Sequence, residues 1–245
     1  MRRFCSDELG KIAALTRGIK LDFTRVFKIA TPLLLEGLKI TVGISIIAIL
    51  IGLVVGLLTC FMGRSKNPLL KGIAAVYVWC IRGTPMMVQA FLVFFAVPQL
   101  IRLVEPTFTI TPFMAGLITL ALNAGAYMSE IFRGGIDAVN FGQVEAARSL
   151  GLSKMKTTLK IVLPQAFKIS IPSLVNQFII TVKDSSILSA IGLGELVNQA
   201  KVYVGAKYDF FPTYITVAAY YLIVISILMV ISKFIEKKLN YDKKG

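Results

Sequence analysis

The sequence predicts an all-α, polytopic membrane protein with five transmembrane helices, and three observations support this fold class. Of the 245 residues, 56% are hydrophobic and only 16% are charged, whereas soluble domains carry roughly a quarter charged residues. The mean hydropathy is +0.76. Charge-free runs such as residues 40–62 and 210–232 are long enough to cross a bilayer, which needs about twenty apolar residues.

The chain begins with a basic segment and continues into the first predicted span. Residues 1–30 are mixed in charge and lack the apolar core of a signal peptide, so we expect a basic leader or surface helix there. One transmembrane domain then covers residues 31–245, with its first span over residues 32–63. The small residues Ala48, Gly52 and Gly56 repeat every fourth position in this span. That spacing favours close packing against another helix of the same chain rather than a dimer seam.

The second apolar region, residues 72–101, is too long for one straight crossing and contains Arg82. We expect an interfacial helix up to residue 81, a break at Arg82, Gly83, Thr84 and Pro85, and then a span. Proline is tolerated at such a helix start, because its missing N–H would be unsatisfied there anyway.

Three further spans are expected along the rest of the chain. The third covers about residues 112–132, the fourth runs from about Pro164 to Lys183 and Asp184, and the fifth covers residues 210–232. The loops after spans one and three and the C-terminal tail are basic. By the positive-inside rule this places the C-terminus in the cytoplasm and the N-terminus outside, although the basic leader argues against that side.

Residues 143–164 form a polar, basic interruption between spans three and four. Gly151 stands where a left-handed helix end is needed, and Ser153 can cap a second helix that Pro164 interrupts. Glu145 and Arg148 can pair along the first helix or face a partner protein. Two amphipathic helices too short to cross a bilayer predict a surface that docks on a soluble protein.

Missing residue types exclude several classes of chemistry. The chain has no histidine, which removes His-dependent catalysis and His metal sites. Cys5, Cys60 and Cys80 form no CxxC pattern, so neither a disulfide framework nor a zinc site is indicated. No phosphate-binding GxxxxGK[ST] loop occurs. We therefore expect no enzyme, no cofactor and no metal site in this chain. The net charge of +14 fits basic cytoplasmic loops that face anionic lipid, without a nucleic-acid partner.

The polar stretch resembles the EAA loop of binding-protein-dependent ABC importer permeases. Residues of the matching types are Glu145, Ala146, Ala147, Gly151, Leu163 and Pro164. Outside the loop, Arg82-Gly83-Thr84-Pro85 followed by Gln89, the stretch around Asn123, and Lys183-Asp184-Ser185-Ser186 are similar to the polar amino acid branch of that family.

The resemblance implies a MetI-like permease fold in a bacterial inner membrane, with a cytoplasmic coupling loop over residues 140–164. It implies that this chain imports amino acids as the permease subunit of a larger assembly. The implied partners are separate ATPase chains, which hydrolyse the ATP, a second permease chain, identical or related, and an extracytoplasmic binding protein.

Lys183 and Asp184 are the leading candidates for lining a substrate site, together with Ser185. Charged side chains at membrane depth cost at least about 2.5 kcal/mol each and usually face a cavity. An amino acid zwitterion offers a carboxylate to Lys183 and an ammonium group to Asp184. The alternative, without a role in substrate binding, places this pair at the outer membrane–water interface, where the side chains reach water.

The other polar residues inside the spans have two interpretations each. Gln89 and Asn123 could contact a substrate or tie two helices together by hydrogen bonds. Arg82, Gly83, Thr84 and Pro85 fit a gate, but Arg82 could equally anchor on lipid headgroups. Glu130 and Arg133 are expected to form a structural pair.

A secondary transporter or channel that needs no ATPase is the alternative function. Membrane charge pairs and proline-broken helices occur in such proteins as well. Two features argue against it. The chain has only five spans in one copy, and the loop predicted to dock on a soluble protein would have no purpose in such a transporter. The sequence leaves the identity of the transported amino acid open.

Overall fold

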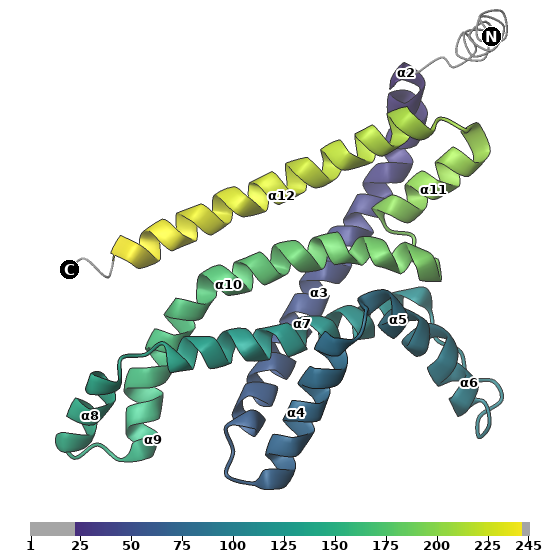
Figure 1. Cartoon of the computed structure of the whole chain (residues 1–245). Coiled ribbons are helices and arrows are strands. Elements are labelled where there is room, and N and C mark those ends of the chain that lie inside the picture. Colours follow the sequence, from purple (N-terminus) through teal and green to yellow (C-terminus); the bar gives the residue numbers. More distant parts are fainter. Residues whose placement is uncertain (1–22, 242–245) are drawn as a thin grey trace, which may run out of the picture.

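The computed structural model describes residues 23–241, of which residues 239–241 are described by their backbone alone. Every element in this part of the chain is a helix (Figure 1). The long elements are α3 (Thr31–Gly63), α4 (Pro68–Gly83), α7 (Pro112–Asp137), α10 (Leu163–Asp184), α11 (Leu196–Lys207) and α12 (Phe210–Tyr241). The short ones are α2 (Phe23–Arg25), η1 (Val26–Ala30), α5 (Met86–Phe91), η2 (Leu92–Ala96), α6 (Val97–Ile101), α8 (Phe141–Ser149), α9 (Lys154–Thr157), η3 (Thr158–Val162) and η4 (Ser185–Ile191).

The first helical rod, made of α2, η1 and α3, starts before the boundary expected from the sequence. Helices α2, η1 and α3 run together over Phe23–Gly63, so the last part of the expected leader belongs to the folded body. Val26 and Ala30 are fully buried against α11 and α12. These apolar residues stand four apart, which continues one helical face toward the N-terminus. Residues 1–22 of the leader lie outside the described residues.

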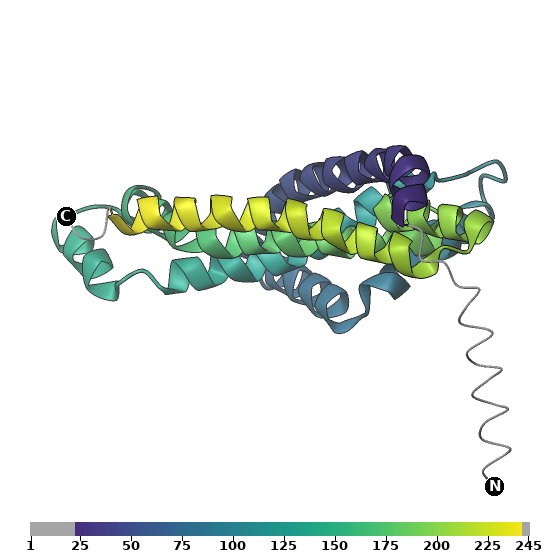
Figure 2. The same ribbon diagram turned by 90° about the horizontal axis from the view of Figure 1, so that it is seen from above.

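Three described helices are long and apolar enough to cross a membrane: Phe23–Gly63, Pro112–Asp137 and Phe210–Lys238. Pro68–Gly83 and Met86–Ile101 meet the same test together and are bent by 108° at the expected break, which is the geometry of a broken span or of a re-entrant loop. Helix α10 is more polar and does not meet the same test, so the count of five spans remains a prediction. It nevertheless runs between α7 and α12 in both views (Figures 1 and 2).

The most extensive helix packing joins α3 to α7. A Cβ atom on Gly56 would lie 2.7 Å from the Cβ of Met128 and 2.9 Å from the carbonyl oxygen of Gly125. One on Gly52 would lie 3.0 Å from the Cβ of Ala124. The small-residue stripe therefore lets two backbones of the same chain approach closely, which confirms its expected intramolecular role.

Helix α11 lies against the first half of α3. The backbone of Leu196 is so close that a Cβ on Gly37 would be 2.8 Å from its Cα, and its N–H donates to Thr41 Oγ1 at 3.2 Å. Leu34, Leu196, Ala200 and Val204 form a buried cluster there. Helix α11, which lies between α10 and α12 in the sequence, is thus held against the first rod by a hydrogen bond and by apolar packing.

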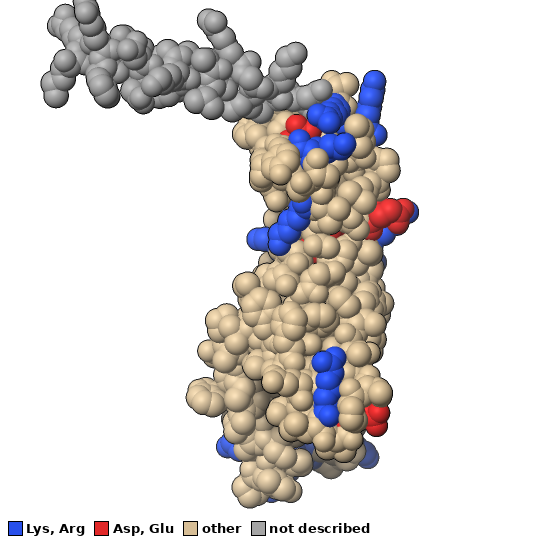
Figure 3. Space-filling model, turned by 90° about the vertical axis from the view of Figure 1, so that its right-hand side faces the viewer, with Lys and Arg blue, Asp and Glu red and all other residues tan. Residues whose placement is uncertain are grey.

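The bundle has two distinct ends. Helices α8 and α9 lie at one end with the last turns of α12, and α2 and α11 lie at the other (Figures 1 and 2). On the face shown in Figure 3, charged side chains gather toward the upper part and a few lie near the lower end, with a broad uncharged area between them. This distribution is typical of a surface that faces lipid.

Candidate functional site

The polar loop between α7 and α10 folds as two short helices with a sharp turn between them. Gly151 ends α8 with a φ of 82°. Its N–H donates to the Arg148 carbonyl oxygen at 3.0 Å, and Leu152 N–H donates to the Ala147 carbonyl oxygen at 3.1 Å. This pair of hydrogen bonds is a Schellman motif. Ser153 Oγ then accepts the Lys156 N–H at 3.3 Å and caps α9. Both expected caps are confirmed.

Pro164 does not interrupt the second helix, contrary to the expectation. The backbone stays helical from α9 through η3 into α10, and Pro164 lies in the first turn of α10. The intervening η3 is a π-helix, whose wider turn relieves the clash between a proline ring and the preceding carbonyl groups. Leu163, half-buried beside it, continues the helix.

The two short helices present uncovered apolar side chains. Leu150 is 82% exposed and Met155 is 72% exposed, and Phe141 and Leu159 are exposed as well. Of the three residues that start the EAA pattern, Glu145 and Ala146 are exposed and Ala147 is buried. Within residues 23–241 no ion pair joins Glu145 to Arg148, whose guanidinium donates instead to the Leu152 carbonyl oxygen at 3.0 Å. Glu145 therefore stays available to a partner.

The break after α4 is closed by one amide side chain. Gln89 Nε2 donates to the carbonyl oxygens of Ile81 at 2.7 Å and Thr84 at 3.0 Å, and to Thr84 Oγ1 at 2.9 Å. Asn123 Nδ2 donates in turn to Gln89 Oε1 at 3.3 Å. Both amides are buried. These contacts favour the helix-tying interpretation of Gln89 and Asn123 over direct substrate contact.

Arg82 lies at the bend and belongs to a charged cluster with α7. Its guanidinium is 3.2 Å from Glu130 Oε2 and 5.3 Å from the centroid of the Tyr127 ring. Glu130 also pairs with Arg133, as expected. Gly83 is exposed, and no atom lies within 4 Å of where its Cβ would be. Arg82, Gly83, Thr84 and Pro85 thus form a bend whose arginine is held by a neighbouring helix.

Lys183 and Asp184 end α10 beside a cavity of about 480 Å³ between α10, α11 and α12. Ser186 and Tyr221 line the same cavity. Ser185, which the sequence placed in the lining, is fully buried instead, and its hydroxyl donates to the Val182 carbonyl oxygen at 2.8 Å. Ser185 follows Asp184 directly, and successive side chains in a helix are about 100–120° apart, so its side chain turns to the buried side.

Glu195 is a site residue that sequence reasoning missed. Its fully buried carboxylate caps α11, accepting the N–H groups of Asn198 at 2.7 Å and Val197 at 2.9 Å, and Tyr221 Oη donates to it at 3.3 Å. Burial raises the pKa of Glu195 to about 7, although these hydrogen bonds and the charge of Lys201 oppose that shift. An acidic residue directly after Gly192-Leu193-Gly194 and before a helix was the available signal.

Comparison with known proteins places these features in a family. Residues 56–241 match the family described as "Binding-protein-dependent transport system inner membrane component". A putative glutamine transport system permease protein GlnP from Rickettsia typhi is 40% identical over 207 residues, which cover 84% of this chain and 92% of the relative. The glutamine transport system permease protein GlnP from Escherichia coli K12 is 36% identical, with coverage of 91% and 99%.

Solved structures agree with this assignment. The chain superposes with a TM-score of 0.83 on a chain from the crystal structure of an amino acid ABC transporter with histidines, at 36% identity and with coverage of 90% and 100%. An inward-facing structure of the MetNI methionine ABC transporter gives a TM-score of 0.70 at 20% identity, with coverage of 84% and 96%. The second comparison supports the fold alone.

Proposed function

The chain belongs to the inner-membrane components of binding-protein-dependent transport systems, and we propose how this permease of an ABC amino acid importer works. Family membership argues against transport without an ATPase, the alternative that the sequence had left open. The relatives named for glutamine transport, together with the amino acid transporter structure, support an amino acid as the cargo.

The α8–α9 pair is the proposed docking surface for a separate ATPase chain. The single observation that carries this proposal is its exposed apolar side chains, Leu150, Met155 and Leu159, at the end of the bundle. An exposed apolar patch marks a contact with lipid or with a partner protein, and the charged residues interspersed on α8–α9 favour a partner protein here. Glu145 adds an exposed carboxylate to the same surface.

The remaining partners follow from the same assembly. We expect a second permease chain, identical or related, beside this one, and an extracytoplasmic binding protein at the end that carries α11. The C-terminal end of α12 lies at the α8–α9 end of the bundle (Figure 1). We therefore propose that the C-terminus lies in the cytoplasm and Phe23 outside, which agrees with the orientation expected from the basic loops.

Lys183 and Asp184 are the proposed groups for the cargo's own charges. Their cavity is lined by one cation and one carboxylate, which suit the carboxylate and ammonium of an amino acid. Gln89 and Asn123 support the pathway indirectly, because they hold the bend at Arg82, Gly83, Thr84 and Pro85 in place.

The variant Gly151→Val tests the docking surface. A branched side chain in the left-handed region costs about 1–2 kcal/mol and misdirects α9, so less ATPase should co-purify with the permease and uptake should fall. Ser149→Val introduces the same side chain at an exposed helical position of α8 and serves as the matched control. Equal ATPase recovery and uptake for Gly151→Val and wild type would contradict the assignment.

A further inference from the structure

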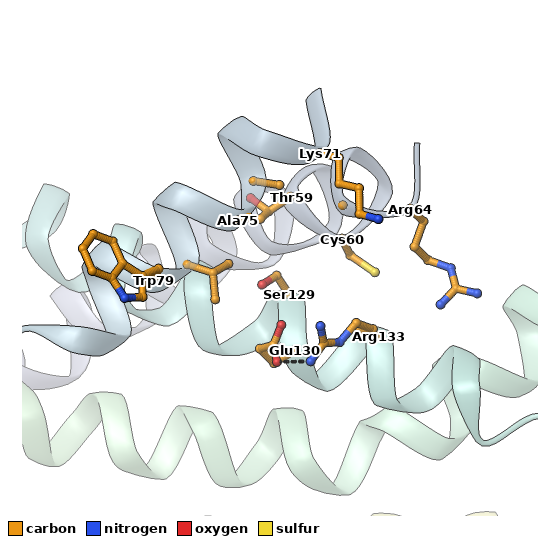
Figure 4. Close-up of a pocket in the computed structure, with 12 residues that line it drawn as sticks. Thr59, Cys60, Arg64, Lys71, Ala75, Trp79, Ser129, Glu130 and Arg133 are labelled. Atoms are coloured by element: carbon orange, nitrogen blue, oxygen red, sulfur yellow. Dashed lines mark hydrogen bonds and ion pairs between the residues drawn. The ribbon is translucent and has the colours of Figure 1, made fainter. Parts of the chain in front are cut away.

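A groove of about 350 Å³ opens between the end of α3, the start of α4 and the last part of α7 (Figure 4). It lies at the end of the bundle that carries α8, because Arg64 after α3 pairs with Asp137 at the end of α7 at 2.6 Å. Its floor contains the buried residues Thr59, Cys60 and Ser129. The groove is separate from the cavity beside Asp184.

One side of the groove is cationic. Arg64, Lys71 and Arg133 line it, and they come from three different parts of the chain (Figure 4). Asp137 pairs with Arg64, and Glu130 pairs with Arg133. Lys71 has no ion pair within the described residues, and it is exposed. Three cations and two carboxylates leave one positive charge at this side, which favours an anionic ligand.

The opposite side of the groove is apolar and continues onto the outside of the protein. Ala75, Val78 and Trp79 line it, and Trp79 is 75% exposed. Ile73 and Val76 on the same helix are also exposed. Tryptophan is enriched where a membrane protein crosses from headgroups to acyl chains.

We propose that this groove binds one anionic phospholipid, with the headgroup phosphate at Lys71 and an acyl chain along Val78 and Trp79. A phosphate bound to basic side chains alone could come from a soluble phosphoester. The apolar wall that runs from the cations to the lipid-facing side of α4 favours a ligand with an attached hydrocarbon chain. Basic pockets between membrane helices bind anionic headgroups in this way.

Trp79 makes the proposal directly measurable, because it is the chain's one tryptophan. The full chain is placed in phosphatidylcholine nanodiscs, and brominated phosphatidylglycerol is titrated in while Trp79 fluorescence is recorded. Wild type should reach half-maximal quenching at a phosphatidylglycerol fraction about fivefold lower than Lys71→Gln, the ratio that one lysine's attraction to an anionic membrane provides. Brominated phosphatidylcholine should show no such difference between the two proteins.

Lys66→Gln is the matched control, because it removes the same charge from the exposed loop before α4 but lies outside the groove. This variant should behave as wild type. Equal quenching of wild-type Trp79 by the two brominated lipids would overturn the proposal. An equal loss of phosphatidylglycerol quenching in Lys66→Gln and Lys71→Gln would overturn it as well. A change in Trp79 emission on addition of soluble glycerol 3-phosphate, without anionic lipid, would also overturn it in favour of a free phosphoester.

Discussion

Glu195 connects three parts of the fold, and its replacement by glutamine has a calculable effect. The carboxylate caps α11, and Tyr221 of α12 donates to it. The next residue, Leu196, bonds to Thr41 of α3. Glutamine is nearly the same size and stays neutral. Glu195→Gln therefore imitates the protonated acid while the surrounding helices stay in place.

The raised pKa fixes the direction of the pH effect. The folded protein binds the Glu195 proton with a pKa of about 7, against the ordinary value of 4.5. The group's contribution to stability is therefore fully present below pH 4.5 and is lost as the pH rises toward 7. The free energy of unfolding changes by at most about 3 kcal/mol over this range. For a chain of this length, that corresponds to roughly 6–12 °C in melting temperature. Lys201 of α11, the charged group that faces Glu195, favours the anion and opposes the pKa shift.

Thermal unfolding of the purified chain in detergent, measured from pH 5 to pH 8, tests this reasoning. The wild-type melting temperature should fall as the pH rises, and Glu195→Gln should lose most of that dependence. Glu36→Gln removes an exposed carboxylate on α3 and should keep the wild-type slope. A wild-type melting temperature that stays constant over this range, or an unchanged slope in Glu195→Gln, would refute the argument.

Three other substitutions have defined outcomes. Gly56→Ala should cost about 1–3 kcal/mol of unfolding free energy through overpacking against α7, seen as a lower melting temperature, whereas Gly43→Ala, with no atom within 4 Å of its new Cβ, should not destabilise. Gln89→Ala should cost about 1–3 kcal/mol of unfolding free energy, because it leaves the buried Asn123 amide and the Ile81 carbonyl oxygen without their partner; an unchanged melting temperature would contradict the helix-tying role of Gln89. Asp184→Ala should reduce amino acid uptake while the assembled complex still hydrolyses ATP, and normal substrate affinity would remove Asp184 from the lining.

Local backbone chemistry explains why much of the fold could be predicted from the sequence. Pro112 and Phe210 begin helices where the apolar runs begin, and Gly63 ends the first rod. Gly151 adopts the left-handed conformation that only glycine reaches cheaply. Such features depend on a few neighbouring residues, so they can be inferred without knowing the packing.

Features that depend on the local helix type or on contacts with distant parts of the chain could not be predicted in the same way. Ser185 falls on the buried side of η4, and Pro164 stays helical because a π-helix precedes it. The burial of Glu195 cannot be inferred from the sequence, because it results from the packing of α11 against α3 and α12. Gln89 and Asn123 had two open interpretations, and their mutual contact across 34 positions favours one of them.

The continuous helix through Pro164 changes how the proposed docking surface on α8–α9 relates to the proposed cargo cavity beside Lys183 and Asp184. A break at Pro164 would have let α9 move without α10. Because α9, η3 and α10 are joined, one helical path runs from Lys154 to Asp184, about 45 Å along its contour at 1.5 Å per residue. A displacement of α9 by a bound ATPase is therefore carried by hydrogen-bonded backbone to Lys183 and Asp184. The π-helix and Pro172 inside α10 are the two points where this path can bend. Stiffening either point should change how strongly ATP hydrolysis is coupled to uptake, without changing the docking surface itself.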